Sequence, residues 1–249
     1  MEPTCFYWQH HELGPVLGVG LTAELKLDHQ FDQTLVQDFM AAHKGHYIFG
    51  YLSYDLKNSF EALASENPEK LNFPALHFWV PESLYQLKEK PSLIWGLAQQ
   101  ENQDLAQKFL DLFEDKNSRI SANFQARTTK NRYVDQFEKL KNALQRGDIY
   151  EVNYCQEFHI ENHELANPVG LFGRLSELTK APHAAFLQTN DHVVLCASPE
   201  RFMQKKGPLL RSEPIKGTAP RSEDKAQDQQ IATALQNNPK ERAENIMIV

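Results

Sequence analysis

The chain has 249 residues, of which 41% are hydrophobic and 24% are charged, a composition typical of a globular protein with a sizeable core. Its net charge of -7 and its pI of about 5.8 argue against general nucleic-acid binding, which needs a basic surface. The sequence contains no apolar run near the roughly 20 residues that span a bilayer and no signal-peptide pattern, so we expect no membrane segment.

The first part of the chain predicts a sheet and one helix. Three runs rich in aromatic and β-branched residues predict strands, and they cover residues 46–54, 76–80 and 92–97. Apolar residues at helical spacing predict a helix over residues 104–114. The polar stretch that follows predicts a domain boundary, so we expect an N-terminal region, residues 1–118, and the first part of a second region, residues 119–249.

The second region is predicted to alternate helices with β-structure. Its first helix, of about 15 residues, carries an apolar stripe and stops at Gly147, and residues 149–160 then predict a strand. Turn residues predict two hairpins, one over residues 184–197 and one over residues 201–212. Further helices are expected over residues 171–178 and from an N-cap at Ser222 to about Asn237. This order predicts an α+β fold, a layered sandwich of largely antiparallel sheets with helices.

The three cysteines are odd in number and far apart, at positions 5, 155 and 196. They form no CxxC pair and no disulfide framework, and they predict a reducing compartment, the cytoplasm. The sequence also lacks the glycine-rich motifs that bind nucleotides, so it gives no support to a nucleotide-binding function.

Three ionisable residues in the last quarter of the chain could form an enzyme site. Lys216 lies in a loop with proline and glycine, and its amine can act as a nucleophile once burial or a nearby cation lowers its pKa. Glu200, sixteen residues earlier, can act as a general acid or base, and Glu244 can act as a metal carboxylate. Each residue alone also suits an ordinary structural role: Lys216 a solvated loop, and Glu200 a salt bridge to Arg201 or Arg211.

Four sequence motifs occur in an order and at spacings that match one enzyme family. They are Gly147-Asp148-Ile149-Tyr150-Glu151-Val152-Asn153, Ser198-Pro199-Glu200-Arg201-Phe202, Pro214-Ile215-Lys216-Gly217-Thr218-Ala219-Pro220-Arg221 and Arg242-Ala243-Glu244-Asn245-Ile246-Met247-Ile248-Val249. Together with Gly50-Tyr51-Leu52-Ser53-Tyr54-Asp55, this set resembles the chorismate-utilising enzymes, which include anthranilate, aminodeoxychorismate, isochorismate and salicylate synthases. The resemblance covers nearly the whole chain and implies the anthranilate synthase-like form of the predicted fold.

Position 216 narrows the resemblance. Anthranilate synthases typically have Ala at this point of the motif, whereas aminodeoxychorismate synthases of the lysine type carry Pro-Ile-Lys-Gly-Thr, as this chain does. Gln156 agrees, because the isochorismate enzymes resemble this region but carry a Lys base there. Glu151 departs from the family, which commonly has Gln at this point, and we expect the difference to have little effect on the chemistry.

The resemblance implies that chorismate is aminated at C4 to 4-amino-4-deoxychorismate, for para-aminobenzoate and folate biosynthesis. It implies Lys216 as the nucleophile at C2 and Glu200 as the acid that protonates the departing C4 hydroxyl. It implies Mg²⁺ as the cofactor, with Glu244 as a ligand that helps to polarise the substrate. The substrate-binding residues that it implies are Gly217, Thr218 and Gln156.

The chain shows no Cys-His-Glu glutaminase constellation of its own, so the resemblance implies a separate glutaminase subunit that supplies ammonia from glutamine. Relatives usually continue past the point that corresponds to Val249, with an Asp and an Arg-Asn-Asp motif. We therefore expect this sequence to be the N-terminal part of the enzyme, inactive alone, with an incomplete sandwich and exposed sheet edges.

Two alternatives stay open. An anthranilate synthase component I, from the same family, would form a different product from chorismate and ammonia, and Lys216 argues against it. A non-catalytic ligand-binding paralogue, or an inactive truncated product, would keep the fold without turnover. The joint presence of Lys216, Glu200 and Glu244 argues against this second alternative.

Overall fold

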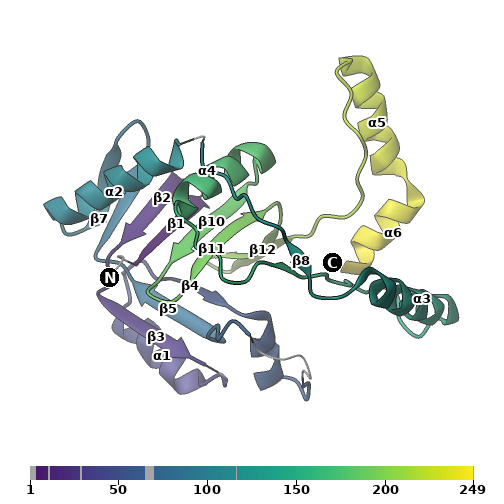
Figure 1. Cartoon of the computed structure of the whole chain (residues 1–249), viewed down its shortest axis with the longest axis horizontal. Coiled ribbons are helices and arrows are strands. Elements are labelled where there is room, and N and C mark those ends of the chain that lie inside the picture. Colours follow the sequence, from purple (N-terminus) through teal and green to yellow (C-terminus); the bar gives the residue numbers. More distant parts are fainter. Residues whose placement is uncertain (1–3, 11, 29, 65–69, 116, 249) are drawn as a thin grey trace.

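The body of the chain is built on an antiparallel sheet of six strands, called the main sheet (Figure 1). The computed structural model describes residues 4–10, 12–28, 30–64, 70–115 and 117–248. The strands lie in the order β11 (Val193–Ser198), β10 (His183–Gln188), β1 (Cys5–His10), β2 (Gly14–Val19), β6 (Ser83–Leu87) and β7 (Pro91–Gly96). Every neighbouring pair is antiparallel.

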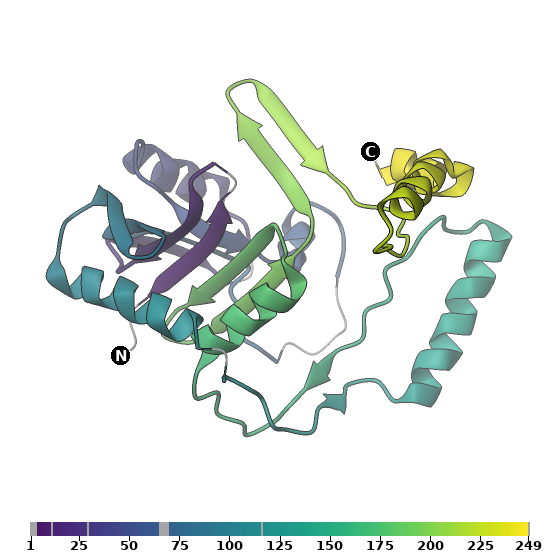
Figure 2. The ribbon, with the colours of Figure 1, turned by 90° about the horizontal axis from the view of Figure 1, so that it is seen from above.

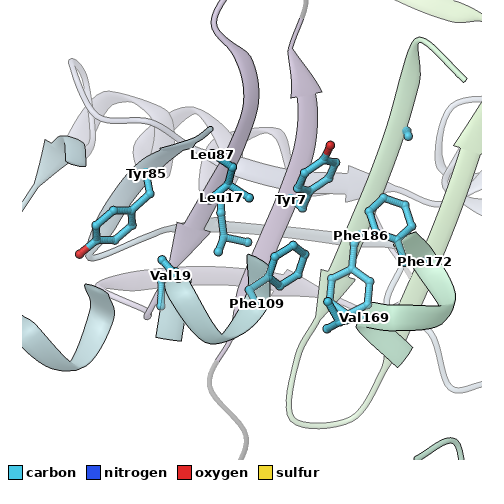
Figure 3. Close-up of a cluster of buried hydrophobic side chains, with 11 residues drawn as sticks. Tyr7, Leu17, Val19, Tyr85, Leu87, Phe109, Val169, Phe172 and Phe186 are labelled. Atoms are coloured by element: carbon cyan, nitrogen blue, oxygen red, sulfur yellow. The ribbon is translucent and has the colours of Figure 1, made fainter. Parts of the chain in front are cut away.

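Two helices cover one face of the main sheet. They are α2 (Gln100–Phe113) and α4 (Pro168–Thr179), which pack on the sheet and on each other. In the core between helices and sheet, shown in Figure 3, the ring of Tyr7 stacks on Phe109 with centroids 5.8 Å apart and meets Phe172 edge-on at 5.2 Å. Burial raises the pKa of the Tyr7 hydroxyl to about 12, because the charged phenolate would lose its water.

A smaller sheet packs on the opposite face. Its strands lie in the order β3 (Ala23–Leu27), β5 (Leu76–Val80) and β4 (Phe49–Leu52). Phe49 and Trp79 of this sheet share a buried cluster with Val16 and Leu187 of the main sheet. Gly18 on β2 allows the close approach, because a Cβ there would lie 2.7 Å from the Phe49 ring. Main-sheet residues therefore alternate between two cores, which is the packing of a sandwich.

Two further elements lie between β3 and β5. The helix α1 (Gln33–Ala42) is capped by Asp32, whose carboxylate accepts a hydrogen bond from the Leu35 N–H at 3.0 Å. A short 3-10 helix, η1 (Tyr54–Ser59), follows β4. No helix in the described part of the chain is long and apolar enough to cross a membrane.

Three helices extend to one side of this body (Figure 1). They are α3 (Lys130–Arg146), α5 (Lys225–Asn237) and α6 (Pro239–Ile248), and none of their described residues is buried. The hairpin of β12 (Arg201–Lys206) and β13 (Leu209–Glu213) projects from the body, and the short strands β8 (Gln125–Ala126) and β9 (Phe158–His159) pair with each other (Figure 2). Large apolar side chains stay exposed on this side, among them Phe137, Phe202 and Ile246.

The predicted α+β sandwich of antiparallel sheets is confirmed. β5 covers the predicted residues 76–80, and both predicted hairpins form. α3 ends as expected, because Gly147 has a φ of 80°, a left-handed conformation that glycine adopts without steric cost. The division between residues 118 and 119 stays a prediction, although the main sheet takes strands from both sides of it.

Three local predictions are wrong, at least in part. Residues 149–160 form a strand only at 158–159, and Tyr150 is 91% exposed, because apolar residues form a strand only where a partner strand is at hand. The predicted strand 46–54 shortens to β4, since the chain turns into η1 at Tyr54. Asp224, not Ser222, caps α5, and its carboxylate accepts from the Gln227 N–H at 2.8 Å.

Phe186→Ala should lower the free energy of unfolding by about 3–5 kcal/mol, because it removes a fully buried ring and leaves a cavity. Phe202→Ala is the matched control: its ring is 85% exposed, so the change should stay within about 0.5 kcal/mol. Urea unfolding followed by tryptophan fluorescence measures both. Equal effects in the two variants would contradict the packing described for β10.

Candidate active site

All the predicted site residues except Gln156 gather around one loop beside the β12–β13 hairpin. This loop, residues 214–218, is called the lysine loop, and it carries Lys216 and Gly217 between β13 and α5. Glu200 lies in the turn between β11 and β12, and Glu244 lies on α6. An extended arm of residues 147–157 follows α3 and passes the same loop (Figure 2).

Glu200 fastens the lysine loop to the end of the main sheet. Its Oε1 accepts a hydrogen bond from the backbone N–H of Ile215 at 2.9 Å, directly before Lys216. The backbone of Glu200 is held in turn by Ser198, whose hydroxyl donates to the Glu200 carbonyl at 3.0 Å. The salt bridge considered for Glu200 does not form, because Arg201 and Arg211 both pair with Glu213. The Glu200 side chain is exposed, directly after the end of β11.

Lys216 forms an ion pair with Glu151 of the arm. The two side chains are 26% and 28% exposed, so both are partly shielded from water. The hydrogen bond to Glu151 raises the pKa of the Lys216 amine, the charges of Glu151, Glu244 and Glu200 add to this effect, and burial opposes it. A nucleophilic Lys216 needs a lowered pKa, and the carboxylates around the amine act in the opposite direction.

α6 closes the other side of the lysine loop. Asn245 donates a hydrogen bond from Nδ2 to the Pro214 carbonyl at 3.4 Å. A cavity of about 330 Å³ lies between loop and helices, and its lining includes Lys216, Glu241 and Arg242. Gly217 has a φ of 76°, a left-handed conformation that favours glycine, and a Cβ there would also displace the end of the Glu241 side chain, whose Oε2 would lie 2.7 Å away. The predicted binding of a substrate carboxylate by Gly217 and Thr218 stays a prediction.

Gln156 lies farther along the arm and contacts a different segment. Its Nε2 donates to the Thr128 carbonyl at 3.0 Å. Its Oε1 is buried and has no hydrogen-bond partner among the described residues. A buried acceptor without a donor is costly, so this oxygen is suited to receive an N–H or O–H group from a ligand.

Glu244 offers a single carboxylate to a metal ion. Its Oε1 lies 3.7 Å from the Lys240 Nζ, one helical turn earlier, and its side chain is 40% exposed. The described residues contain no group of three or more His, Cys, Asp or Glu that could hold a metal. Mg²⁺ usually takes one or two protein carboxylates together with water and substrate oxygens, and the predicted role of Glu244 as its ligand stays a prediction.

Glu151 is the site residue that the sequence reasoning missed. It was expected to have little effect, yet it is the direct partner of Lys216 across 65 residues of chain. The available signal was its departure from the family motif, where an amide is replaced by a carboxylate. The distance in sequence hid the contact, because nothing in the local pattern of residues 147–153 indicates which segment the arm will pass.

A second and larger cavity, of about 440 Å³, lies between the smaller sheet and the β10–β11 turn. Its lining includes Lys26, Tyr51, His77 and Asp191. Burial lowers the pKa of His77, although its hydrogen bond to Glu24 opposes the shift. None of the predicted site residues lines this cavity, so it is separate from the lysine loop.

Known proteins resemble this chain over most of its length. The profile of the chorismate binding enzyme family matches residues 3–249. The chain belongs to this family. It is 29% identical over 245 residues to aminodeoxychorismate synthase component 1 of Bacillus subtilis, a match that covers 92% of this chain and 49% of the relative. It is 38% identical over 131 residues to the protein of the same name from Salmonella typhimurium, covering 53% of this chain and 28% of the relative.

A solved structure shows the same fold. The chain superimposes on anthranilate synthase component I from Streptococcus pneumoniae with a TM-score of 0.71 and 20% sequence identity, over 93% of this chain and 58% of that one. The chain therefore spans about half the length of the curated relatives that it matches. The exposed apolar residues of α3, β12 and α6 belong to elements that project from the two-sheet body.

Glu200→Ala should release the lysine loop, because it removes the acceptor of the Ile215 N–H. Amide exchange at Ile215 should quicken roughly tenfold, the effect expected for losing a hydrogen bond of about 1.4 kcal/mol. Glu200→Gln keeps an oxygen acceptor and should leave this exchange near the wild-type rate. Hydrogen exchange followed by NMR makes the measurement, with Phe186 on β10 as the unaffected reference amide. Unchanged exchange in Glu200→Ala would show that the loop is held by other contacts.

Proposed function

We propose that the chain is part of an aminodeoxychorismate synthase component I, which aminates chorismate at C4 to give 4-amino-4-deoxychorismate for para-aminobenzoate and folate biosynthesis. The observation that carries the proposal is the meeting of Glu200 and Lys216 at one loop, through the hydrogen bond from Ile215 to Glu200. Replacing the C4 hydroxyl of chorismate by this route needs an amine that acts as a nucleophile and a carboxylic acid that protonates the leaving oxygen. Family membership and the names of the curated relatives support the same reaction.

Lys216 is the proposed nucleophile. Its Nζ would form a bond to C2 of chorismate while the ring double bonds shift and the bond from C4 to its hydroxyl oxygen breaks. An ammonium has no lone pair, so Lys216 must give up a proton before this attack. Ammonia would then add at C4, and the bond between Nζ and C2 would break to release the lysine and the product.

Glu200 is the proposed acid. A protonated carboxyl would give its proton to the departing C4 oxygen, which leaves as water. Its side chain is exposed beside the lysine loop, where a substrate can reach it. Gly217, Thr218 and Gln156 are proposed to bind the substrate, and the unpartnered Oε1 of Gln156 supports that role for Gln156.

Glu244 is the proposed Mg²⁺ ligand, and the bound ion would supply positive charge that holds a substrate carboxylate and favours loss of the C4 hydroxyl. The protein's own carboxylates around Lys216 would repel the dianionic substrate, so a cation at this position also fits the charge of the site. We propose the cytoplasm as the compartment, since none of the three cysteines forms a disulfide within the described residues.

The direct test is intact-mass measurement of the full-length protein mixed with Mg²⁺ and chorismate in the absence of ammonia. An adduct should form, map to Lys216 and disappear when ammonium is added, with release of 4-amino-4-deoxychorismate. Lys216→Arg should form none, because arginine stays charged. Glu200→Gln should slow adduct formation by about 10²–10⁴-fold with little change in chorismate affinity, and Glu244→Gln should need more Mg²⁺.

The same experiment separates the alternatives. Release of anthranilate instead of 4-amino-4-deoxychorismate would favour an anthranilate synthase. Chorismate binding without any adduct or product would favour a non-catalytic paralogue. Normal product formation by Lys216→Arg would remove Lys216 from the role of nucleophile.

The proposed partner is a glutaminase subunit, because the reaction consumes ammonia and the word component in the relatives' names implies a second component. The full-length protein should therefore form product from added ammonium salts at raised pH, where a larger fraction of the ammonium is deprotonated to ammonia. It should use glutamine only after a glutaminase subunit is added. Product analysis by chromatography distinguishes these cases, and efficient use of glutamine by the purified protein alone would contradict the need for a partner.

A further inference from the structure

The ion pair between Glu151 and Lys216 joins two segments that lie 65 residues apart in the sequence. Glu151 lies on the arm that follows α3, and Lys216 lies on the loop between β13 and α5. The arm has no strand partner at this point, since its paired part is confined to β9. Among the hydrogen bonds and ion pairs of the described residues, this one joins the arm to the lysine loop.

The environment of Lys216 makes Glu151 its dominant partner. Glu151 contacts the ammonium group directly, whereas Glu244 pairs with Lys240 and Glu200 with the Ile215 N–H. A charge-assisted hydrogen bond in a partly shielded site is stronger than a neutral one, so it restrains the rotamers of the long lysine side chain. The same contact is the largest cause of the raised pKa of Lys216.

We propose that Glu151 is a positioning residue for Lys216: its carboxylate holds the Lys216 ammonium in the resting site, and this ion pair must open before the amine can react. The catalytic meaning of this restraint rests on the proposed role of Lys216 as nucleophile. The restraint itself is a property of the two side chains and can be measured without any substrate.

The restraint has a clear chemical effect. A paired ammonium is both protonated and directed at the arm, so it cannot attack an electrophile from the cavity side. Replacing the carboxylate by an amide of the same shape keeps one hydrogen-bond acceptor and removes the charge. Glu151→Gln should therefore release Lys216 without removing the side chain that fills the space between arm and loop.

The test is competitive labelling of the folded protein with acetic anhydride at pH 8, followed by peptide mass spectrometry. Lys141 is the internal reference, since it lies on α3, is 50% exposed and pairs with Glu138. In Glu151→Gln the labelling of Lys216 relative to Lys141 should rise about two- to fivefold, the range that corresponds to a partly exposed ion pair. Glu151→Asp keeps the charge and should restore slow labelling.

Glu157→Gln is the matched control. Glu157 lies on the same arm, but its carboxylate pairs with Arg127 at 2.8 Å, so its loss should leave the labelling of Lys216 unchanged. An increase of equal size in Glu157→Gln would show that loosening the arm, and not the loss of one charge, exposes the lysine. That result would overturn the inference, as would unchanged labelling in Glu151→Gln or labelling of Glu151→Asp as fast as that of Glu151→Gln.

The adduct experiment with chorismate separates this inference from the proposed function. If Glu151→Gln raises the labelling of Lys216 but the full-length protein forms no adduct at Lys216, the positioning contact stands and the nucleophile role fails. If the adduct forms but labelling is insensitive to Glu151, the proposed function stands and the positioning role is wrong.

Discussion

The pairing of β1 with β10 is the constraint on which the rest of the structure depends. The paired residues run from Cys5 with Gln188 to Trp8 with Ala185, so the first strand of the chain is joined to a strand from its last third. Phe186 then faces the helices while its neighbour Leu187 faces the smaller sheet. A slip of one residue would exchange these two faces, so burial on both sides fixes the register of the strand.

A short series of contacts connects β10 to the candidate site. β11 is paired to β10 up to Ser198, whose hydroxyl holds the backbone of Glu200. Glu200 in turn holds Ile215, the neighbour of Lys216. One side of the site is therefore anchored to the main sheet. The other side, formed by the arm and α6, depends on exposed helices and on single contacts such as that of Asn245 with Pro214.

The features that could be predicted from the sequence are those that depend on residues close together in the chain. The strand at residues 76–80 and the helix stop at Gly147 follow from apolar runs and from the conformational freedom of glycine, and both are confirmed. The strand predicted over residues 149–160 is largely wrong, because an apolar run does not reveal whether a partner strand exists. The N-cap of α5 was misplaced by two residues, since Ser222 and Asp224 both have suitable side chains.

In the site, too, the features that depend on neighbouring residues in the sequence could be predicted, and those that depend on distant residues could not. The motifs placed Lys216 and Glu200 close in sequence, and the structure brings them to one loop. The charge state of Lys216 could not be predicted, because it depends on Glu151, which lies 65 residues away. The pKa of a side chain is set by its neighbours in space, so a prediction of it requires the fold to be known first.

The distant pairing of β1 also determines the order in which the chain can fold as it is synthesised. β2 follows β1 at once, so one edge of β1 is satisfied early, but the other edge must wait until β10 has left the ribosome. Throughout that interval β1 has one unpaired edge and apolar residues on both faces, which is a template for wrong pairing. The centre of the main sheet is thus completed late, and the chain depends on protection of its own first strand while the other strands are made.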